Sequence, residues 1–162
     1  MPFRAVVVAL AVAAPSLAAQ AAPPAKVSAS VRRVFGAPAR IDTLALDSST
    51  VLRISRADTL LGFAQVRNVK GKDQPITYLV AVDPAGRLRD VDILVYREPY
   101  GGEVAYEPWR RQFRGKGPDA PLLVGRDIQG ISGATISVNA VTAGVRRAVA
   151  AFAEWRGRGL LR

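Results

Sequence analysis

The chain has 162 residues, of which 49% are hydrophobic, and this is enough for one domain with a buried core. It contains no cysteine and no histidine, which excludes disulfides, haem attachment, ordinary zinc sites and nucleophile–histidine triads, so any redox chemistry needs an organic cofactor. The formal net charge is +10, but the basic residues are scattered and form no aromatic-interleaved stripe, so we expect no nucleic-acid partner.

Residues 1–22 read as a secretory signal peptide. Arg4 precedes the apolar run Ala5–Ala14, and Ser16-Leu17-Ala18 and Ala19-Gln20-Ala21 are both usable cleavage patterns. The run is short for a membrane span, although an uncleaved anchor is the alternative. We therefore expect export to the periplasm or the extracytoplasmic side of the membrane. Removal of the signal peptide would lower the formal net charge from +10 to +9, because Arg4 is its only charged residue.

Residues 23–26 are a linker, and residues 27–162 form the predicted domain. Its first element is a short amphipathic helix that ends at Gly36 and Pro38. The apolar residues of that helix recur at helical spacing: Val27, Val31, Val34 and Phe35.

In the next part of the chain, apolar and polar residues alternate in the way that is typical of half-buried strands. Asp83-Pro84-Ala85-Gly86 is a turn between the last two strands, with proline where a type I or II turn favours it. The expected strands are Ile41–Leu46, Val51–Ile54, Thr59–Val69, Ile76–Val82 and Leu88–Tyr96.

Asp90 and Asp92 lie two apart in the last of these strands, with Val91, Ile93 and Val95 on the opposite face. A pair of carboxylates can act as acid and base, but on a strand face solvated side chains are the safer interpretation. We assign them no catalytic role.

A glycine-bearing loop, Glu98-Pro99-Tyr100-Gly101-Gly102, follows the last strand. Its two glycines permit a close approach of the backbone to a planar ring, on which Tyr96 or Tyr100 could stack. Beyond it, we expect a short helix over Glu107–Gly115, with Trp109 and Phe113 as packing residues, and a short strand at Leu122–Val124.

The strongest helix of the sequence follows a loop of small residues, Gly130-Ile131-Ser132-Gly133-Ala134-Thr135. Ser137 is the expected N-cap, and Gly157 lies where the helix should stop. Unpaired N–H groups at a helix start favour an anion, although a plain capped helix is the commoner explanation of such a loop. The apolar stripe of this helix comprises Val138, Val141, Val145, Ala148, Val149 and Phe152.

Two other interpretations of this loop fail. A nucleophile elbow needs glycine where Ala134 stands and a histidine that the chain lacks, and a phosphate-binding P-loop needs a Gly-Lys-Ser/Thr ending. The pattern as a whole predicts an α+β fold, with a mostly antiparallel sheet and helices at the N-terminal and C-terminal ends.

Ser132-Gly133-Ala134-Thr135 with Ile136-Ser137 resembles the flavinylation motif of the FMN-binding domain family. That family includes the C subunit of sodium-translocating NADH:quinone reductase and the G subunit of ferredoxin:NAD oxidoreductases. The resemblance implies that Thr135 carries FMN through a phosphoester installed by a separate flavin transferase. Members often have an acidic residue three positions before the serine; here that position is Gln129, and the nearest carboxylate is Asp127.

The loop Glu98–Gly102 resembles the family's second motif, Glu-Thr-Pro-Gly-x-Gly, which lies near the flavin, although the spacing differs. The resemblance therefore implies a covalent FMN site composed of Thr135, Ser132, Gly133, Ala134, Ile136, Ser137, Glu98, Pro99, Tyr100, Gly101 and Gly102.

Because no residue resembles a substrate-turning acid or base, we expect an electron-transfer flavoprotein rather than a complete enzyme. Its expected partners are redox proteins, which can be membrane-bound. The alternatives are an exported binding or scaffold domain without redox chemistry, and a basic domain that docks on anionic surfaces.

Overall fold

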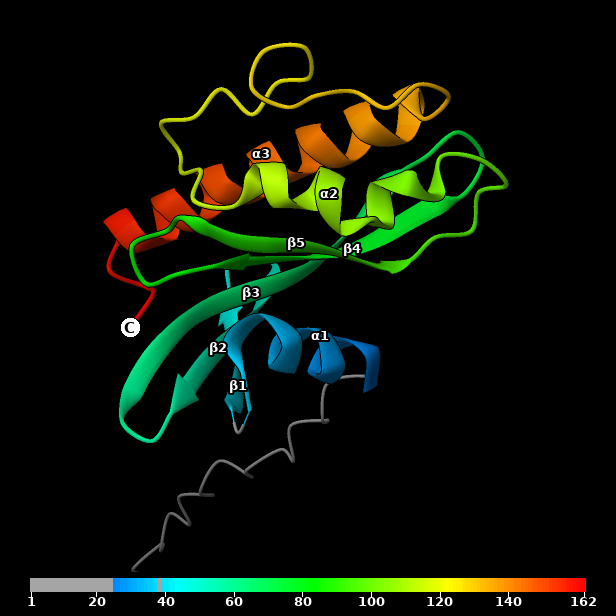
Figure 1. The fold of residues 1–162 in the computed structure, drawn as a ribbon. Coiled ribbons are helices and arrows are strands. Elements are labelled where there is room, and N and C mark those ends of the chain that lie inside the picture. The colour runs from blue at the N-terminus through cyan, green and yellow to red at the C-terminus, as the bar shows by residue number, and fades with distance from the viewer. Residues whose placement is uncertain (1–24, 38) are drawn as a thin grey trace, which may run out of the picture.

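The computed structural model describes residues 25–37 and 39–162, and its centre is an antiparallel sheet of five strands in chain order (Figure 1). Each strand pairs with the next, so the sheet is a meander. All five predicted strands are confirmed, with ends that differ by a few residues at most. They are β1 (Arg40–Leu46), β2 (Ser49–Arg56), β3 (Thr59–Lys70), β4 (Pro75–Val82) and β5 (Leu88–Val95).

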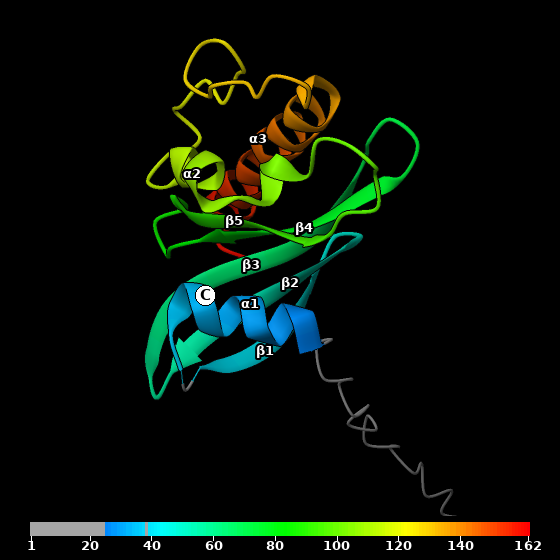
Figure 2. The same ribbon diagram turned by 45° about the vertical axis from the view of Figure 1, so that its right-hand side comes forward.

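Helices cover both faces of this sheet (Figures 1 and 2). Helix α1 (Ala25–Phe35) lies on one face, and the long helix α3 (Thr135–Gly157) lies on the other with the short helix α2 (Glu107–Arg110). The predicted α+β fold with a helix at each end is confirmed. Within the described residues, none of the helices combines the length and apolar character needed to cross a bilayer.

Helix α1 packs its apolar stripe on the sheet as the spacing predicts. Val27, Val31 and Phe35 are buried against a cluster that contains Ile54 and Leu79. The helix begins at Ala25, so the last two residues of the predicted linker belong to its first turn. The predicted signal peptide and the rest of the linker lie outside the described residues.

Helix α3 forms the larger core with the opposite face of the sheet, including Phe63, Tyr78 and Val80. Burial of one such side chain contributes about 1.5–3 kcal/mol, so this layer dominates the hydrophobic stabilisation of the domain. The predicted stripe of this helix is buried throughout: Val138, Val141, Val145, Ala148, Val149 and Phe152.

A glycine allows α3 to approach β4 closely. A Cβ atom at Gly144 would lie 2.1 Å from the Tyr78 hydroxyl and 2.7 Å from Val69 Cγ1. That hydroxyl is fully buried and, among the described residues, has no hydrogen-bond partner. Its burial raises the pKa of Tyr78 above the ordinary value.

The prediction that Asp90 and Asp92 lie on a solvated strand face is wrong. Helix α1 covers that face, and Asp90 is only 3% exposed. Arg33 of α1 contacts Asp90 at 2.9 Å and Asp92 at 2.8 Å, while Arg110 of α2 reaches Asp90 at 3.3 Å. A sheet packed on both sides gives its inward carboxylates arginine partners in place of water.

The predicted strand at Leu122–Val124 is also wrong. The segment contains one isolated bridge, Val124 to Ile128, and Leu122 has a φ of 49°. The Asp127 carboxylate accepts the backbone N–H groups of Leu122 (3.2 Å) and Leu123 (2.8 Å), which folds the chain into a tight loop. A local side-chain acceptor therefore replaces a partner strand.

The predicted short helix after β5 is present in two parts. Helix α2 continues directly into the 3₁₀ turn η2 (Arg111–Phe113), after a first 3₁₀ turn η1 (Gly102–Ala105). Trp109 and Phe113 pack edge to face, with ring centroids 5.1 Å apart. Both are buried, as expected of packing residues.

Candidate functional site

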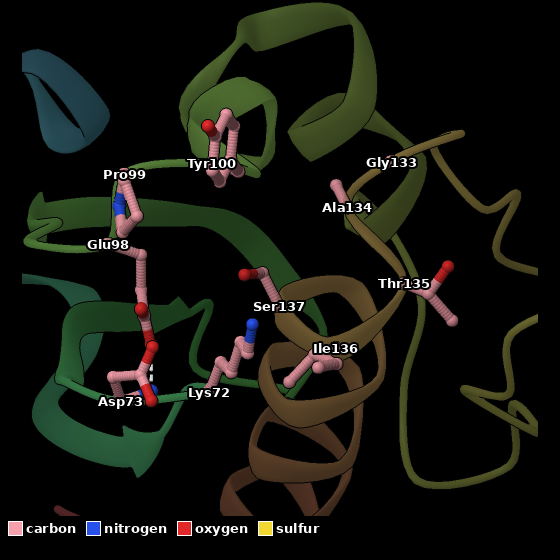
Figure 3. Close-up of a pocket in the computed structure, with 10 residues that line it drawn as sticks. All are labelled: Lys72, Asp73, Glu98, Pro99, Tyr100, Gly133, Ala134, Thr135, Ile136 and Ser137. Carbon is pink, nitrogen blue, oxygen red and sulfur yellow. Dashed lines mark hydrogen bonds between the residues drawn. The ribbon is translucent and has the colours of Figure 1, made fainter.

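The start of α3 and the loop after β5 meet around a pocket of about 270 Å³ (Figure 3). This volume is close to the lower end of the range of about 300–1,000 Å³ for small-molecule sites, so part of a larger ligand would stay outside it. The pocket is lined by Lys72, Asp73, Glu98, Pro99, Tyr100, Gly133, Ala134, Thr135, Ile136 and Ser137. The fold thus brings together the two motifs singled out in the sequence.

Thr135 is the first residue of α3, and its side chain is exposed. Figure 3 shows this side chain pointing away from Tyr100 and Glu98, on the outer side of the helix start. Among the described residues, no side chain caps the helix, because its N-cap residue is Ala134. The first-turn N–H groups therefore remain open to an anion.

Gly133 makes the approach to this helix start accessible. Its φ is 81°, a conformation that favours glycine, and apart from its two chain neighbours no atom of the described chain lies within 4 Å of the position of a Cβ atom there. An oxyanion can therefore come close to the backbone before the helix.

Ser137 is not the N-cap that the sequence predicts, since it is the third residue of α3. Its side chain is turned into the structure, where its Oγ lies 2.7 Å from the Tyr96 hydroxyl. That hydroxyl also donates to the backbone carbonyl of Tyr100. Tyr96 therefore connects the helix start to the loop after β5, and it is not free to stack on a ligand.

Gly101 is buried where the two motifs touch. Its φ is 85°, and a Cβ atom would lie 2.7 Å from the Tyr96 hydroxyl and 3.0 Å from Ser137 Oγ. A side chain at this position would separate the loop from the helix start. Gly101 therefore acts through close packing rather than by contact with the pocket interior.

Glu98 lines the pocket, but its carboxylate is engaged by a neighbouring loop. Oε1 accepts the backbone N–H groups of Asp73 at 2.8 Å and Gln74 at 3.0 Å. The hydrogen bonds from the N–H groups of Gln74 and Asp73 outweigh desolvation and hold the pKa of Glu98 below its ordinary value. Glu98 thus fixes the loop between β3 and β4 to the pocket wall.

Of the predicted site residues, the structure gathers Glu98, Pro99, Tyr100 and the segment 133–137 around the pocket, whereas Ser132, Gly101 and Gly102 lie outside the lining set. Lys72 and Asp73 line the pocket without having been predicted. The sequence holds no local pattern that marks them, because only the contact with Glu98 brings their loop to the site.

The chain just before the motif is fixed through its backbone. The Trp109 indole donates to the carbonyl of Gln129 at 2.9 Å, and Gln112 accepts the Gln129 N–H at 2.7 Å. The Gln129 side chain itself is exposed. Thr135 is therefore presented on a fixed loop.

These features fit a flavin mononucleotide. The open helix start suits a phosphate, and Tyr100, which is 82% exposed beside the pocket, offers an aromatic face to a planar ring. No group of acidic residues in the described part of the chain could hold a metal ion.

Comparison with known proteins agrees with this arrangement. Residues 71–150 match the FMN-binding domain family. The chain is also 36% identical over 95 residues to the G subunit of the proton-translocating ferredoxin:NAD(+) oxidoreductase complex of Clostridium ljungdahlii, and the matched region covers 54% of this chain and 51% of the relative. The chain thus spans about half the length of that protein. The family match includes the pocket and both motifs, and the chain belongs to the FMN-binding domain family.

Proposed function

We propose that this protein is an electron-transfer module that carries FMN covalently on Thr135, attached as a phosphoester by a separate flavin transferase. One observation carries the proposal: an exposed threonine hydroxyl stands at the open start of α3, beside a pocket lined by both motifs. Membership of the FMN-binding family supports the choice of cofactor.

Each part of the pocket has a role in this proposal. The first-turn N–H groups of α3 stabilise the negative charge that the phosphodiester keeps. Tyr100 and Pro99 flank the ring, and the ring supplies the electron chemistry that a chain without cysteine or histidine lacks. The fixed loop before Ser132 presents the threonine to the transferase.

The partners and location follow as proposals of the same kind. The relative from Clostridium ljungdahlii is named as a subunit of an oxidoreductase complex, which supports redox partner proteins for this chain as well. The leader-like residues 1–22 support work on the extracytoplasmic side of the membrane. There, a covalent bond prevents the loss of a cofactor that is not replaced.

Intact mass tests the proposal most directly. Protein made together with a flavin transferase should be heavier by one FMN less one water, and the flavin should remain attached after denaturation. Thr135→Val should abolish this increase because the ester oxygen is gone. Thr59→Val, at an exposed threonine at the start of β3, should keep it. An unmodified protein in the presence of an active transferase, or flavin retained by Thr135→Val, would refute the assignment.

A further inference from the structure

Lys72 is the one cationic side chain among the described residues that line the pocket. It extends from the loop between β3 and β4 toward the start of α3 (Figure 3). Within the described chain, its ammonium group forms no hydrogen bond or salt bridge, so its charge is available to a ligand. The same charge contributes to the lowered pKa of Glu98, which places the two side chains within electrostatic range.

Glu98 determines where that lysine stands. Its carboxylate binds the loop on the far side of Lys72, through Asp73 N at 2.8 Å and Gln74 N at 3.0 Å. On the near side, a Cβ atom at Gly71 would lie 2.3 Å from Glu98 Oε1, so the backbone rests directly on the carboxylate. The loop is therefore anchored on both sides of Lys72.

The Thr135 side chain points in a direction that would keep an ester phosphate on it apart from Lys72. Its side chain points away from the wall formed by Glu98 and Lys72 (Figure 3). An ester phosphate on Thr135 would stay at the outer side of the helix start, whereas the ring, which a ribityl chain separates from the phosphate, can reach the pocket. Lys72 would then face the ring and not the phosphate.

A positive charge beside the ring acts on one redox state more than on the other. Two electrons and one proton convert the neutral oxidised ring into a reduced form with one negative charge. A nearby ammonium group stabilises that form and leaves the oxidised ring almost unaffected, which raises the reduction potential.

We propose that Lys72, positioned by Glu98, sets the reduction potential of the flavin ring in this pocket. The proposal rests on the proposed function, since it needs a flavin on this protein, but it concerns Lys72, a residue that neither motif contains, and gives the motif residue Glu98 a positioning role.

The central test is the midpoint potential of flavin-loaded protein, titrated with dithionite against a reference dye. Lys72→Gln should weaken the preference for the reduced ring about tenfold, which is about 30 mV lower for a two-electron couple. Lys72→Arg should keep the potential. The matched control is Lys70→Gln, which removes the same charge two residues earlier, at the end of β3. An equal shift in both glutamine variants, or none in Lys72→Gln, overturns the proposal.

Free ligands show which part of the nucleotide Lys72 meets. Thr135→Val protein made without the transferase can be titrated with oxidised FMN and with riboflavin, which lacks the phosphate. If Lys72 faces the ring, Lys72→Gln in this background changes both affinities by the same small factor. A loss for FMN alone would place the lysine at the phosphate and refute the proposal. Absence of flavin from both the loaded and the free preparations would instead refute the proposed function.

Two substitutions at Glu98 test its positioning role. Gln and Ala both remove the negative charge, but only Gln keeps an oxygen for the Asp73 and Gln74 N–H groups. We expect a lower potential in Glu98→Ala than in Glu98→Gln, because the alanine variant releases the loop that carries Lys72. In a Lys72→Gln background this difference should vanish. Equal potentials in the two single variants would contradict the positioning role.

Discussion

At the scale of single residues, the pocket depends on close contacts at glycines more than on reactive side chains. Gly101 is the clearest case, because the loop after β5 touches the helix start there. Its positive φ and its short distances to Tyr96 and Ser137 leave no room for a side chain.

We therefore predict that Gly101→Ala destabilises the fold by about 1–3 kcal/mol and reduces flavin loading, because the new methyl group must displace Tyr96 or Ser137. Urea unfolding and intact mass measure the two effects. Gly102→Ala is the control, since its Cβ would meet the Tyr96 ring at an ordinary 3.8 Å. Equal losses in the two variants would show that packing at Gly101 is not the cause.

Acid should loosen the loops around the pocket. Backbone N–H groups hold the pKa of Glu98 below its ordinary value. Burial raises the pKa of Asp127, but the N–H groups of Leu123 and Leu122, with Lys116, outweigh it and leave that pKa lowered as well. A carboxyl with a lowered folded-state pKa stabilises the fold fully above its unfolded pKa, and this contribution is lost as the pH falls through the folded value.

We accordingly expect the free energy of unfolding to decrease as the pH falls below the ordinary pKa of 4.5 for Glu98 and 3.8 for Asp127. Urea titrations from pH 6 to pH 3 measure the decrease. Glu98→Gln should make it shallower because one of the titrating groups is gone. A stability that rises toward pH 3 would contradict this assignment of charge states.

Single residues also mark the limit of sequence reasoning about the site. The motif residues 133–137 and Glu98 line one pocket, and their role toward a flavin stays a prediction. Lys72 could not be found, because its place depends on a hydrogen bond from Gln74 to a glutamate 24 residues away along the chain. Ser137 was misjudged as a cap because its hydroxyl partner, Tyr96, is a tertiary neighbour 41 residues away.

At the scale of elements, α3 and β4 are fitted to one another at Gly144. A glycine in the middle of a helix normally costs about 1 kcal/mol relative to alanine, so alanine should be stabilising. Here the methyl group would collide with Tyr78 and Val69.

We predict that Gly144→Ala lowers stability by about 1–3 kcal/mol instead of raising it. Tyr78→Phe should recover part of that loss in the double variant, because it removes the hydroxyl nearest to the new methyl group. Thermal or urea unfolding of the unsubstituted protein, the two single variants and the double variant gives the coupling free energy between the two positions. Gly157→Ala is the control, since the described chain leaves open space at its Cβ position. A stabilised Gly144→Ala protein would disprove the close fit.

The elements themselves follow from local patterns in most of the chain. Alternation predicts the strands, and the period of α3 predicts its buried stripe, because both faces depend on neighbours close in sequence. The prediction of a strand at Leu122–Val124 failed because three apolar residues are too few to show a period. The Asp127 carboxylate accepts the backbone N–H groups that a partner strand would otherwise bind. The prediction of a solvated Asp90 failed because the alternation of polar and apolar residues shows that the strand has a second face, but not that a helix covers that face.

At the scale of the whole molecule, a buried ion cluster joins three layers at the β5 edge. Asp90 of β5 contacts Arg33 of α1, Arg110 of α2 and Arg114. The Arg110 guanidinium also donates to the carbonyls of Ala105 and Val91 at 2.8 and 2.9 Å. The side chain therefore links the segment that leads to α2 with the sheet.

Arg110→Ala should lower the free energy of unfolding by about 3 kcal/mol, because it leaves part of the charge on Asp90 uncompensated in a buried site. Urea unfolding monitored by circular dichroism measures this. Arg158→Ala is the matched control, since its ion pair with Asp47 lies at the surface and should contribute little. Comparable losses at the two arginines would mean that burial of the cluster does not matter.

The hydroxyl of Tyr96 has a single hydrogen, and this fixes the direction of its hydrogen bonds. Since that hydrogen goes to the Tyr100 carbonyl, the neighbouring contact must be a donation from Ser137 to Tyr96. Ser137 therefore has no proton left for an incoming phosphate oxygen, although it lines the pocket. In the proposed site, recognition of the phosphate would therefore fall to the backbone N–H groups at the start of α3, while this serine can only accept hydrogen bonds on the pocket side.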